Sequence, residues 1–438
     1  MFFLYTLLSV CFSLLLLPIA PFILSRKKYR HRILQRLGFG LAGQLAPLAL
    51  RASAAPTCWI HALSVGEVTS ALPLVRGIRE ALPEVRIIFS ATTNSGGQVA
   101  QHLLASYADA IIAGPIDLGP TVRTFLKAIG PDLFILVETD FWPHWLHLLA
   151  RHQVPLFLVN GRISQKSFAN YQRYAVLFRP MFNAFTLLSM QTGADAEKMR
   201  SLGVGPEKVV TLGNLKYDTH LTRGPMKDEA TKRETKAAYG FDSNAPLWIC
   251  GSTHRGEEQL LFSALLELRR IIPDLQLLIA PRNIERTGEI VSLARQANLA
   301  CRTWTEARHT GEGILILDTI GDLVNCYPMA EVVFIGGSLV PLGGHNPIEP
   351  AAAEIPVLFG PHMEDFTEIA AELVENGGAR QVTSTASLAA AVQQLCTDPL
   401  LHRSMASAAG ECVRANRGVV RRHLEIITTL LSPTSANG

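Results

Sequence analysis

From residue 57 onward the chain repeats one pattern. A short run of apolar, often β-branched residues is followed by a turn with Gly, Ser, Asn or Pro and then by a helical stretch. This alternation predicts an α/β fold with parallel sheets, and the continuous apolar runs are typical of strands covered by helices on both faces. The expected strands are 58–64, 85–91, 110–113, 133–137, 155–159 and 187–191 in the first half, and 247–250, 275–280, 314–318, 332–335 and 356–359 in the second.

The two sets of strands are separated by residues 217–245, which are polar, dense in charge and without a strong apolar period. We therefore predict two doubly wound, Rossmann-like domains, 57–216 and 246–438, joined by this linker. A helical tail, about 385–431, packs on the second domain or crosses back to the first. Two such domains present the carboxyl ends of their sheets to a shared cleft, where we expect the ligands to bind.

The first 24 residues contain no charged side chain. At about 1.5 Å per residue they are long enough to cross a hydrocarbon layer of about 30 Å. A cleaved signal peptide needs basic residues before its apolar run, whereas here they follow it, at 26–36. We predict a membrane anchor, 1–24, and a basic juxtamembrane segment, 25–56, whose cations face anionic headgroups on the cytoplasmic side. Pro18 and Pro21 leave open a kinked or interfacial helix.

Composition narrows the class of protein. The 438 residues are 48% hydrophobic and 18% charged, which excludes a disordered, collagen-like or disulfide-scaffold protein. Seven scattered cysteines form no Cys-x-x-Cys pair, which favours a reducing compartment and argues against a zinc knuckle. The net charge of +3 hides seven basic residues before the first acidic one, Glu67, so the remaining body is mildly acidic.

Candidate chemistry in the first half lies where strands end. Glu67 follows the first strand and suits a general base, although a carboxylate that merely begins a helix is the alternative. Glu138 and Asp140 follow the strand 133–137, and two carboxylates serve as acid and base or bind a metal. The sequence has no Asp-x-Asp or His-x-x-x-His cluster, which argues against a metal, and Asp140 alternatively caps the next helix. Lys216 leans into the cleft or is a surface charge.

In the second half, Arg282 follows a strand and offers a bidentate fork for a phosphate, with a surface arginine as the alternative. Residues 336–344 contain four glycines, which let the backbone approach a ligand. Pro347 stands at an expected first helical position, where free N–H groups face a phosphate, and Glu349 in the first turn suits the hydroxyls of a ribose. A purely structural glycine turn remains the alternative, and no P-loop motif is present.

Several stretches together resemble the 3-deoxy-D-manno-octulosonic acid (Kdo) transferases of Gram-negative bacteria. They occur in the family order and cover nearly the whole chain. The matching motifs are His-Ala-Leu-Ser-Val-Gly-Glu at 61–67, Glu-Thr-Asp-Phe-Trp-Pro at 138–143, Asn-Gly-Arg-Ile-Ser at 160–164, Gly-Asn-Leu-Lys at 213–216, Ser-Thr-His-Arg-Gly-Glu at 252–257, Pro-Arg at 281–282, Gly-Gly-Ser-Leu at 336–339 and Gly-Gly-His-Asn-Pro-Ile-Glu at 343–349.

The resemblance implies a GT-B glycosyltransferase of lipopolysaccharide biosynthesis that moves Kdo from CMP-Kdo to the lipid A precursor, lipid IVA, with inversion and without a metal. It implies an inner-membrane protein with its body on the cytoplasmic face, no cofactor beyond the donor substrate and no nucleic-acid partner. Glu67 matches the family's proton acceptor, and Glu138 and Lys216 match its transition-state stabilisers. The implied CMP contacts are Pro281, Arg282, Ile320, Gly321, Asp322, Asn346, Pro347, Ile348 and Glu349.

Three positions depart from the family pattern. Asp140 stands where a second Glu is common, Asn283 where His often follows Pro-Arg, and Gly161 where Ala usually precedes the arginine. A role for Asp140 in binding the sugar carboxylate is therefore not carried over. The rival hypotheses are a membrane-bound GT-B enzyme that uses a nucleoside diphosphate sugar, and a twin-Rossmann epimerase or non-catalytic sugar-nucleotide binding protein.

Overall fold

The computed structural model describes Tyr5, Thr6, Ser9, Leu15 and residues 27–49, 55–138, 141–218, 225, 228–306 and 313–431. The expected anchor, 1–24, lies almost entirely outside these residues, as does Asp140. Within the described part, no helix is long and apolar enough to cross a membrane. The chain divides into two compact units, unit 1 with residues 1–219 and 418–438, and unit 2 with residues 220–417.

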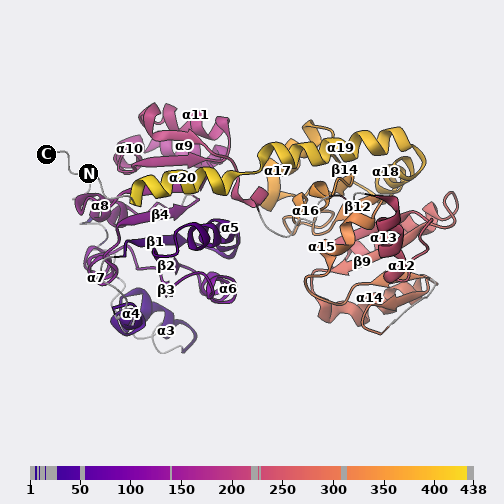
Figure 1. Cartoon of the computed structure of the whole chain (residues 1–438), viewed down its shortest axis with the longest axis horizontal. Helices are drawn as coiled ribbons and strands as arrows, with labels where there is room; N and C mark the ends of the chain where they lie inside the picture. Colours follow the sequence, from indigo (N-terminus) through magenta and orange to yellow (C-terminus); the bar gives the residue numbers. More distant parts are fainter. Residues whose placement is uncertain are drawn as a thin grey trace. The chain divides into compact units, whose positions relative to one another are not determined.

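Unit 1 is built on a parallel sheet in the order β3-β2-β1-β4-β5-β6-β7 (Figure 1). Its strands are β1 (Thr57–Ala62), β2 (Arg86–Ala91), β3 (Ala110–Ala113), β4 (Leu133–Val137), β5 (Leu156–Gly161), β6 (Leu187–Met190) and β7 (Val209–Thr211). Its helices are α3 (Lys27–Arg36), α4 (Leu41–Ala49), α5 (Val65–Ala81), α6 (Asn94–Leu104), α7 (Gly119–Ile129), α8 (Pro143–Arg151), α9 (Gln165–Arg173), α10 (Ala175–Asn183), α11 (Gly193–Ser201) and α20 (Val419–Leu431).

Successive side chains of β1 enter two separate cores, because side chains alternate along a strand. Trp59 packs with residues of α4, α7 and α8 on one face of the sheet. Cys58 and Ile60 pack with residues of α5, α6 and α20 on the other. Helices therefore cover both faces, as the continuous apolar runs predicted.

Unit 2 has a second parallel sheet, in the order β10-β11-β9-β8-β12-β13-β14. Its strands are β8 (Leu247–Thr253), β9 (Gln276–Pro281), β10 (Cys301–Thr303), β11 (Ile314–Ile316), β12 (Val332–Ile335), β13 (Val357–Phe359) and β14 (Ala379–Gln381). Its helices are α12 (Glu229–Ala238), α13 (Glu257–Leu268), α14 (Thr287–Gln296), α15 (Leu323–Cys326), α16 (Ile348–Ala352), α17 (Thr367–Glu375), α18 (Thr385–Thr397) and α19 (Pro399–Asn416).

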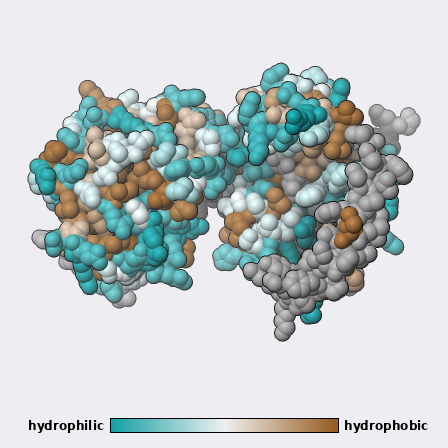
Figure 2. Space-filling model, turned by 180° about the vertical axis from the view of Figure 1, so that it is seen from behind, coloured by the Kyte–Doolittle hydropathy of each residue, from teal (hydrophilic) through white to brown (hydrophobic). Residues whose placement is uncertain are grey.

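The predicted α/β class and all eleven predicted strands are confirmed. The strands that the pattern missed, β7, β10 and β14, each have three residues and lie at sheet edges. Hydrophilic side chains occupy most of the surface that is coloured in Figure 2, and apolar ones form small separate patches.

Part of the predicted linker folds as part of unit 2. Lys236 on α12 is 3% exposed, donates to the carbonyl of Ala245 at 2.9 Å and lies 3.2 Å from Glu331. Lys232 forms a second ion pair with Glu331 at 2.8 Å. Because lysines rather than apolar side chains attach α12, the hydrophobic pattern did not indicate this packing.

The basic segment before β1 also packs on the fold. Arg32 of α3 donates to the carbonyl of Thr93 at 3.0 Å, and Arg36 donates to that of Gly114 at 3.1 Å. Leu41 and Leu45 of α4 are buried in the core. The expectation that these two arginines face lipid headgroups is thus wrong, because carbonyl groups that follow the ends of β2 and β3 bind them instead.

The helical tail divides between the units: α18 and α19 belong to unit 2, and α20 belongs to unit 1 (Figure 1). The carboxylate of Asp218 accepts hydrogen bonds from the backbone N–H groups of Gly418 at 2.9 Å and Val420 at 2.7 Å. A Cβ atom at Gly77 of α5 would lie only 2.7 Å from Val420, so glycine permits the close approach of α20. The predicted second domain, 246–438, differs from unit 2 in this last helix.

We predict that stability falls with acid through His423 of α20. His423 is fully buried, with Nδ1 2.7 Å from the carbonyl of Val419 and Nε2 2.9 Å from Ser189 Oγ. Burial lowers its pKa from 6.5 to about 4. Below pH 6.5 the unfolded chain gains a proton that the folded chain does not, which costs up to about 3 kcal/mol as the pH approaches 4.

Thermal unfolding of wild type and His423→Gln between pH 4 and pH 7.5 checks this expectation. The variant is expected to lose less stability than wild type between pH 6.5 and pH 4. Parallel curves for the two proteins would show that another group causes the acid sensitivity.

Candidate functional site

In unit 1 the direction of the strand order reverses between β1 and β4, the position at which open α/β sheets bind ligands. Glu67 follows β1 and Glu138 follows β4. The paired register of these strands, with His61 opposite Leu136, brings their carboxyl ends to the same edge. The sequence therefore placed both carboxylates correctly on this edge of the sheet.

Glu67 is the third residue of α5 and is 8% exposed. Its Oε2 accepts a hydrogen bond from the N–H of Leu63 at 2.5 Å, and its Oε1 lies 3.5 Å from the hydroxyl of Ser64. The carboxylate thus binds a backbone N–H group at the start of α5, which fits the alternative that Glu67 only begins the helix. The same hydrogen bond fixes its position at the end of β1, and its role as a base stays a prediction.

Glu138 and the turn that carries Lys216 contact the same buried side chain, Asn160. Asn160 Nδ2 lies 3.5 Å from Glu138 Oε1, and Asn160 Oδ1 accepts from the N–H of Leu215 at 2.9 Å. Glu138 and Asn160 both have positive φ, 60° and 57°, which is uncommon for residues other than glycine and clusters at functional sites. The structure therefore links two of the three predicted catalytic residues.

Two further buried amides complete this network. Gln191 donates to the carbonyl of Asn160 at 3.0 Å and accepts from the amide of Asn214 at 3.0 Å. Asn214 Oδ1 accepts from the N–H of Lys216 at 3.0 Å. Sequence reasoning gave no role to these amides, although polar residues at the ends of apolar strands were a usable signal.

The departure at Gly161 has a steric reason. A Cβ atom there would lie 2.8 Å from both Leu158 Cδ2 and Met190 Sδ. The register between β5 and β6 shifts between Leu158 and Gly161, so the two strands are irregular at this point. Glycine fits this chain where alanine is usual.

Asp140 is not the residue that caps α8, although the sequence left that role open for it. The N-cap residue is Trp142, and the carboxylate of Asp117 accepts from the N–H groups of His144 at 3.3 Å and Trp145 at 3.2 Å. Asp117 comes from the segment before α7, so sequence proximity could not identify it.

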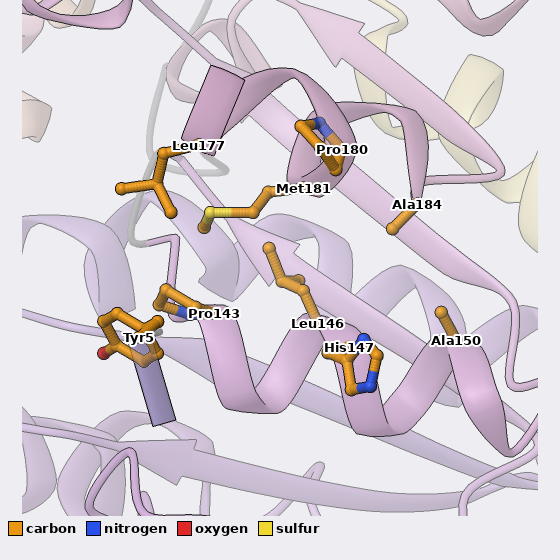
Figure 3. Close-up of a pocket in the computed structure, with 9 residues that line it drawn as sticks. All are labelled: Tyr5, Pro143, Leu146, His147, Ala150, Leu177, Pro180, Met181 and Ala184. Carbon is orange, nitrogen blue, oxygen red and sulfur yellow. The ribbon is translucent and has the colours of Figure 1, made fainter. Parts of the chain in front are cut away.

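An apolar pocket of about 250 Å³ lies between α8 and α10 (Figure 3). Figure 3 shows Leu146 and His147 of α8 facing Leu177 and Met181 of α10, with Tyr5 at one end. The full lining is Tyr5, Pro143, Leu146, His147, Ala150, Leu177, Pro180, Met181 and Ala184. Seven of these nine residues are apolar, so the pocket suits an apolar chain.

In unit 2 the strand order reverses between β8 and β12, and most of the predicted nucleotide contacts follow strands at this edge. Arg282 directly follows β9; its guanidinium is exposed and makes no hydrogen bond or ion pair with the described residues. In contrast, Arg286 forms a bidentate pair with Glu258 at 2.9 and 3.1 Å. Ile320, 84% exposed, Gly321 and Asp322 follow β11.

The first part of the glycine-rich loop already binds an anion, the carboxylate of Glu257. Fully buried at the start of α13, Glu257 accepts from the N–H groups of Gly337 at 2.8 Å, Ser338 at 3.1 Å and Leu339 at 3.0 Å. These three amides are therefore not free to bind a ligand, and the expectation that the glycines let the loop backbone approach one stays a prediction. For the three amides the structural alternative holds.

The second part of the loop leads into α16. Pro347 is the N-cap residue, one position before the helix, and the N–H of Ile348 donates to Asn346 Oδ1 at 3.0 Å. Pro347 was expected to be the first residue of the helix, followed by free N–H groups. The N–H of Ile348, however, is already bonded to Asn346. Glu349 accepts from Asn346 Nδ2 at 3.1 Å, and burial raises the pKa of its carboxyl. Asn283 Oδ1 caps a short turn by accepting from the N–H of Glu285 at 2.9 Å.

Two histidines at this edge were missed by sequence reasoning. His254 follows β8, His345 lies in the glycine-rich loop, and their Nε2 atoms are 2.8 Å apart. Among the residues that the structure describes, no three His, Cys, Asp or Glu side chains gather in a way that could hold a metal ion. That no metal is needed stays a prediction.

Known proteins resemble this chain in sequence and in fold. A family model for 3-deoxy-D-manno-octulosonic-acid transferase (kdotransferase) matches residues 31–219. The 3-deoxy-D-manno-octulosonic acid transferase of Haemophilus influenzae is 31% identical over 98% of each chain. That of Rickettsia felis is 30% identical over 89% of this chain and 82% of its own.

Two solved structures share the fold at low identity. A UDP-GlcNAc 2-epimerase from Neisseria meningitidis has a TM-score of 0.57 at 13% identity, covering 85% of this chain and all of its own. A glycosyltransferase from Rickettsia africae has a TM-score of 0.56 at 15% identity, covering 87% of this chain and all of its own. Because epimerases and glycosyltransferases share this GT-B architecture, the fold alone does not separate two of the hypotheses.

Proposed function

Because the chain belongs to the family of 3-deoxy-D-manno-octulosonic acid (Kdo) transferases, we propose that it is a glycosyltransferase that moves Kdo from CMP-Kdo to the lipid A precursor lipid IVA. The likeness to a Kdo transferase over almost the whole of both chains carries this proposal. The edges of the two sheets supply groups that suit the two halves of the reaction.

Glu67 is the proposed general base. In an inverting transfer, an acceptor hydroxyl attacks the anomeric carbon while the bond from that carbon to the phosphate oxygen of CMP breaks. The hydroxyl proton passes to the base, and the electron pair of the broken bond stays on the phosphate. The hydrogen bond from Leu63 supports this role because it holds the carboxylate in one orientation.

Glu138 and Lys216 are the proposed transition-state stabilisers. Positive charge develops at the anomeric carbon and negative charge on the leaving phosphate, so a carboxylate and an ammonium group suit the reaction. Their common attachment to the Asn160 network supports a shared role. No metal is required for this scheme, because CMP is a good leaving group and cations of the chain assist it.

A lipid acceptor and attachment to the inner membrane, with the body on the cytoplasmic face, rest on the leader. Residues 1–24 are uncharged and apolar, and Arg30 of α3 is exposed. The apolar pocket between α8 and α10 offers walls for an acyl chain. Mass spectrometry of lipid IVA after incubation with CMP-Kdo tests the function, and consumption of a UDP-sugar without addition of Kdo would favour the nucleoside diphosphate alternative.

For the donor, we predict that Arg282→Ala and Glu349→Ala each weaken CMP binding by about 10- to 150-fold, the loss of one charge-assisted contact worth roughly 1.5–3 kcal/mol. Arg282 has no internal partner to lose, so its removal leaves the fold intact. Calorimetric titration with CMP measures the effect, and Arg403→Ala, an exposed arginine on α19, is the control. Unchanged affinity in both variants would show that unit 2 holds the nucleotide elsewhere.

A further inference from the structure

His254 and His345 form a pair of imidazoles at the point where the strand order of unit 2 reverses. Their rings are parallel within 5°, with centroids 5.1 Å apart, and their Nε2 atoms are 2.8 Å apart. At that distance one nitrogen donates and the other accepts, so at least one imidazole is neutral. Gly337 permits the contact, because a Cβ there would lie 3.2 Å from His345 and 3.3 Å from His254.

The charged groups around the pair are two arginines and two glutamates. His254 faces Arg282, Arg286 and Glu258, and His345 faces Arg282. Glu258 is neutralised by Arg286, and the Glu257 carboxylate is occupied by backbone N–H groups, one of them from His254 itself. Of these two arginines, Arg282 is the one that makes no hydrogen bond or ion pair with the described residues.

Both imidazoles are uncharged in this environment. Burial and the nearby arginines lower the pKa of both imidazoles, and His254 adds to this effect on His345, whose pKa falls to about 4. With no anion beside them, both rings are therefore neutral at pH 7. An anion that arrives beside the rings has the opposite effect, because it favours the imidazolium form.

The pair is placed to meet an anion because the loop amides are not available for one. Glu257 holds the N–H groups of Gly337, Ser338 and Leu339. The donors that remain at this edge include the two imidazoles and Arg282. We propose that the His254–His345 pair takes up one proton from solvent when a nucleotide phosphate binds, and that the imidazolium so formed binds that phosphate.

The identity of the nucleotide rests on the proposed function. In the proposed transfer reaction, the pair would also stabilise the leaving phosphate. When the bond between the anomeric carbon and the phosphate oxygen breaks, the phosphate charge changes from −1 in the diester to between −1.5 and −2 in the monoester. An imidazolium beside it stabilises this added charge and assists departure of CMP.

Calorimetry of the full chain with cytidine 5′-methyl phosphate tests the proposal. This diester keeps one negative charge between pH 5.5 and pH 8, so it adds no proton of its own. Titrations at pH 7 in buffers of different ionisation heat are expected to show uptake of up to one proton. Affinity is expected to rise as the pH falls from 8 to 6, by at most 10-fold per pH unit.

Variants assign the proton to the pair. His254→Asn and His345→Asn are each expected to abolish the uptake and flatten the pH profile. His402→Asn is the matched control, because His402 is also a partly buried histidine of unit 2 but contacts the carbonyl of Glu331, at the opposite edge of the sheet, at 2.9 Å. It is expected to bind as wild type does.

Two results would overturn the proposal while leaving the proposed function in place. One is diester binding by wild type without proton uptake, a measurement that needs no variant. The other is uptake that persists in both folded histidine variants, which would assign the proton to another group such as Glu349. If neither CMP nor its methyl ester bound at all, the proposed function itself would fail.

Discussion

Glu67→Gln is expected to lower kcat by a factor of about 10²–10⁴, the usual contribution of a general base. Glutamine keeps the size of the side chain and a carbonyl oxygen that accepts the hydrogen bond from Leu63, but it is not basic. CMP affinity should therefore stay unchanged, and kcat and KM for CMP-Kdo transfer, measured with the melting temperature on one preparation, check the result.

The alternative role of Glu67, as a carboxylate that only begins α5, predicts the opposite outcome. The loss of a charge at a helix start costs about 0.3–1 kcal/mol of stability and leaves turnover near normal. Asp195→Asn supplies the comparison, because Asp195 is also a buried third residue of a helix and accepts from the N–H of Ile163 at 3.1 Å. Near wild-type transfer by Glu67→Gln would remove Glu67 from the mechanism.

Lys216→Met is expected to lower kcat by a factor of about 10²–10³, as when one preorganised electrostatic group is removed from a transition state. Methionine keeps the length of the side chain and removes only its charge. Transfer assays at saturating donor measure the effect. Lys208→Met is the control, because Lys208 of the same unit donates to the carbonyl of Asn183 and has no predicted catalytic role.

Because Asn160 contacts both Glu138 and the turn that carries Lys216, the two charges are expected to act together. The double variant Glu138→Gln with Lys216→Met should then lose less activity than the product of the single losses. Fully multiplicative losses would show that the two groups act independently, and an unchanged kcat in Lys216→Met would exclude a catalytic role for that residue.

The central strands were predictable because they are buried on both faces and have continuous apolar runs. The edges were harder, since the short strands β7, β10 and β14 each include polar residues and are only partly buried. The attachment of α12 was not predictable from a hydrophobic pattern, because Lys232 and Lys236 make it through Glu331. Patterns of apolar residues thus revealed the cores and missed contacts that depend on charge.

The candidate site divides in the same way. Glu67, Glu138 and Arg282 could be predicted because parallel strands bring their carboxyl ends to one edge of a sheet. The occupation of the glycine-rich loop by Glu257 could not, because a sequence does not show which anion faces its N–H groups. The contact of His254 with His345 joins residues 91 positions apart, and neither neighbourhood alone indicates it.

The return of α20 to unit 1 sets an order of events during synthesis of the protein. Val419 and Ile427 complete the core against α5, yet they leave the ribosome after every residue of unit 2. Unit 2 can finish folding while unit 1 still exposes the apolar face of α5 that α20 will cover. The first unit to be translated is therefore the last to be completed, and that exposed face is the surface a chaperone would protect in the nascent chain.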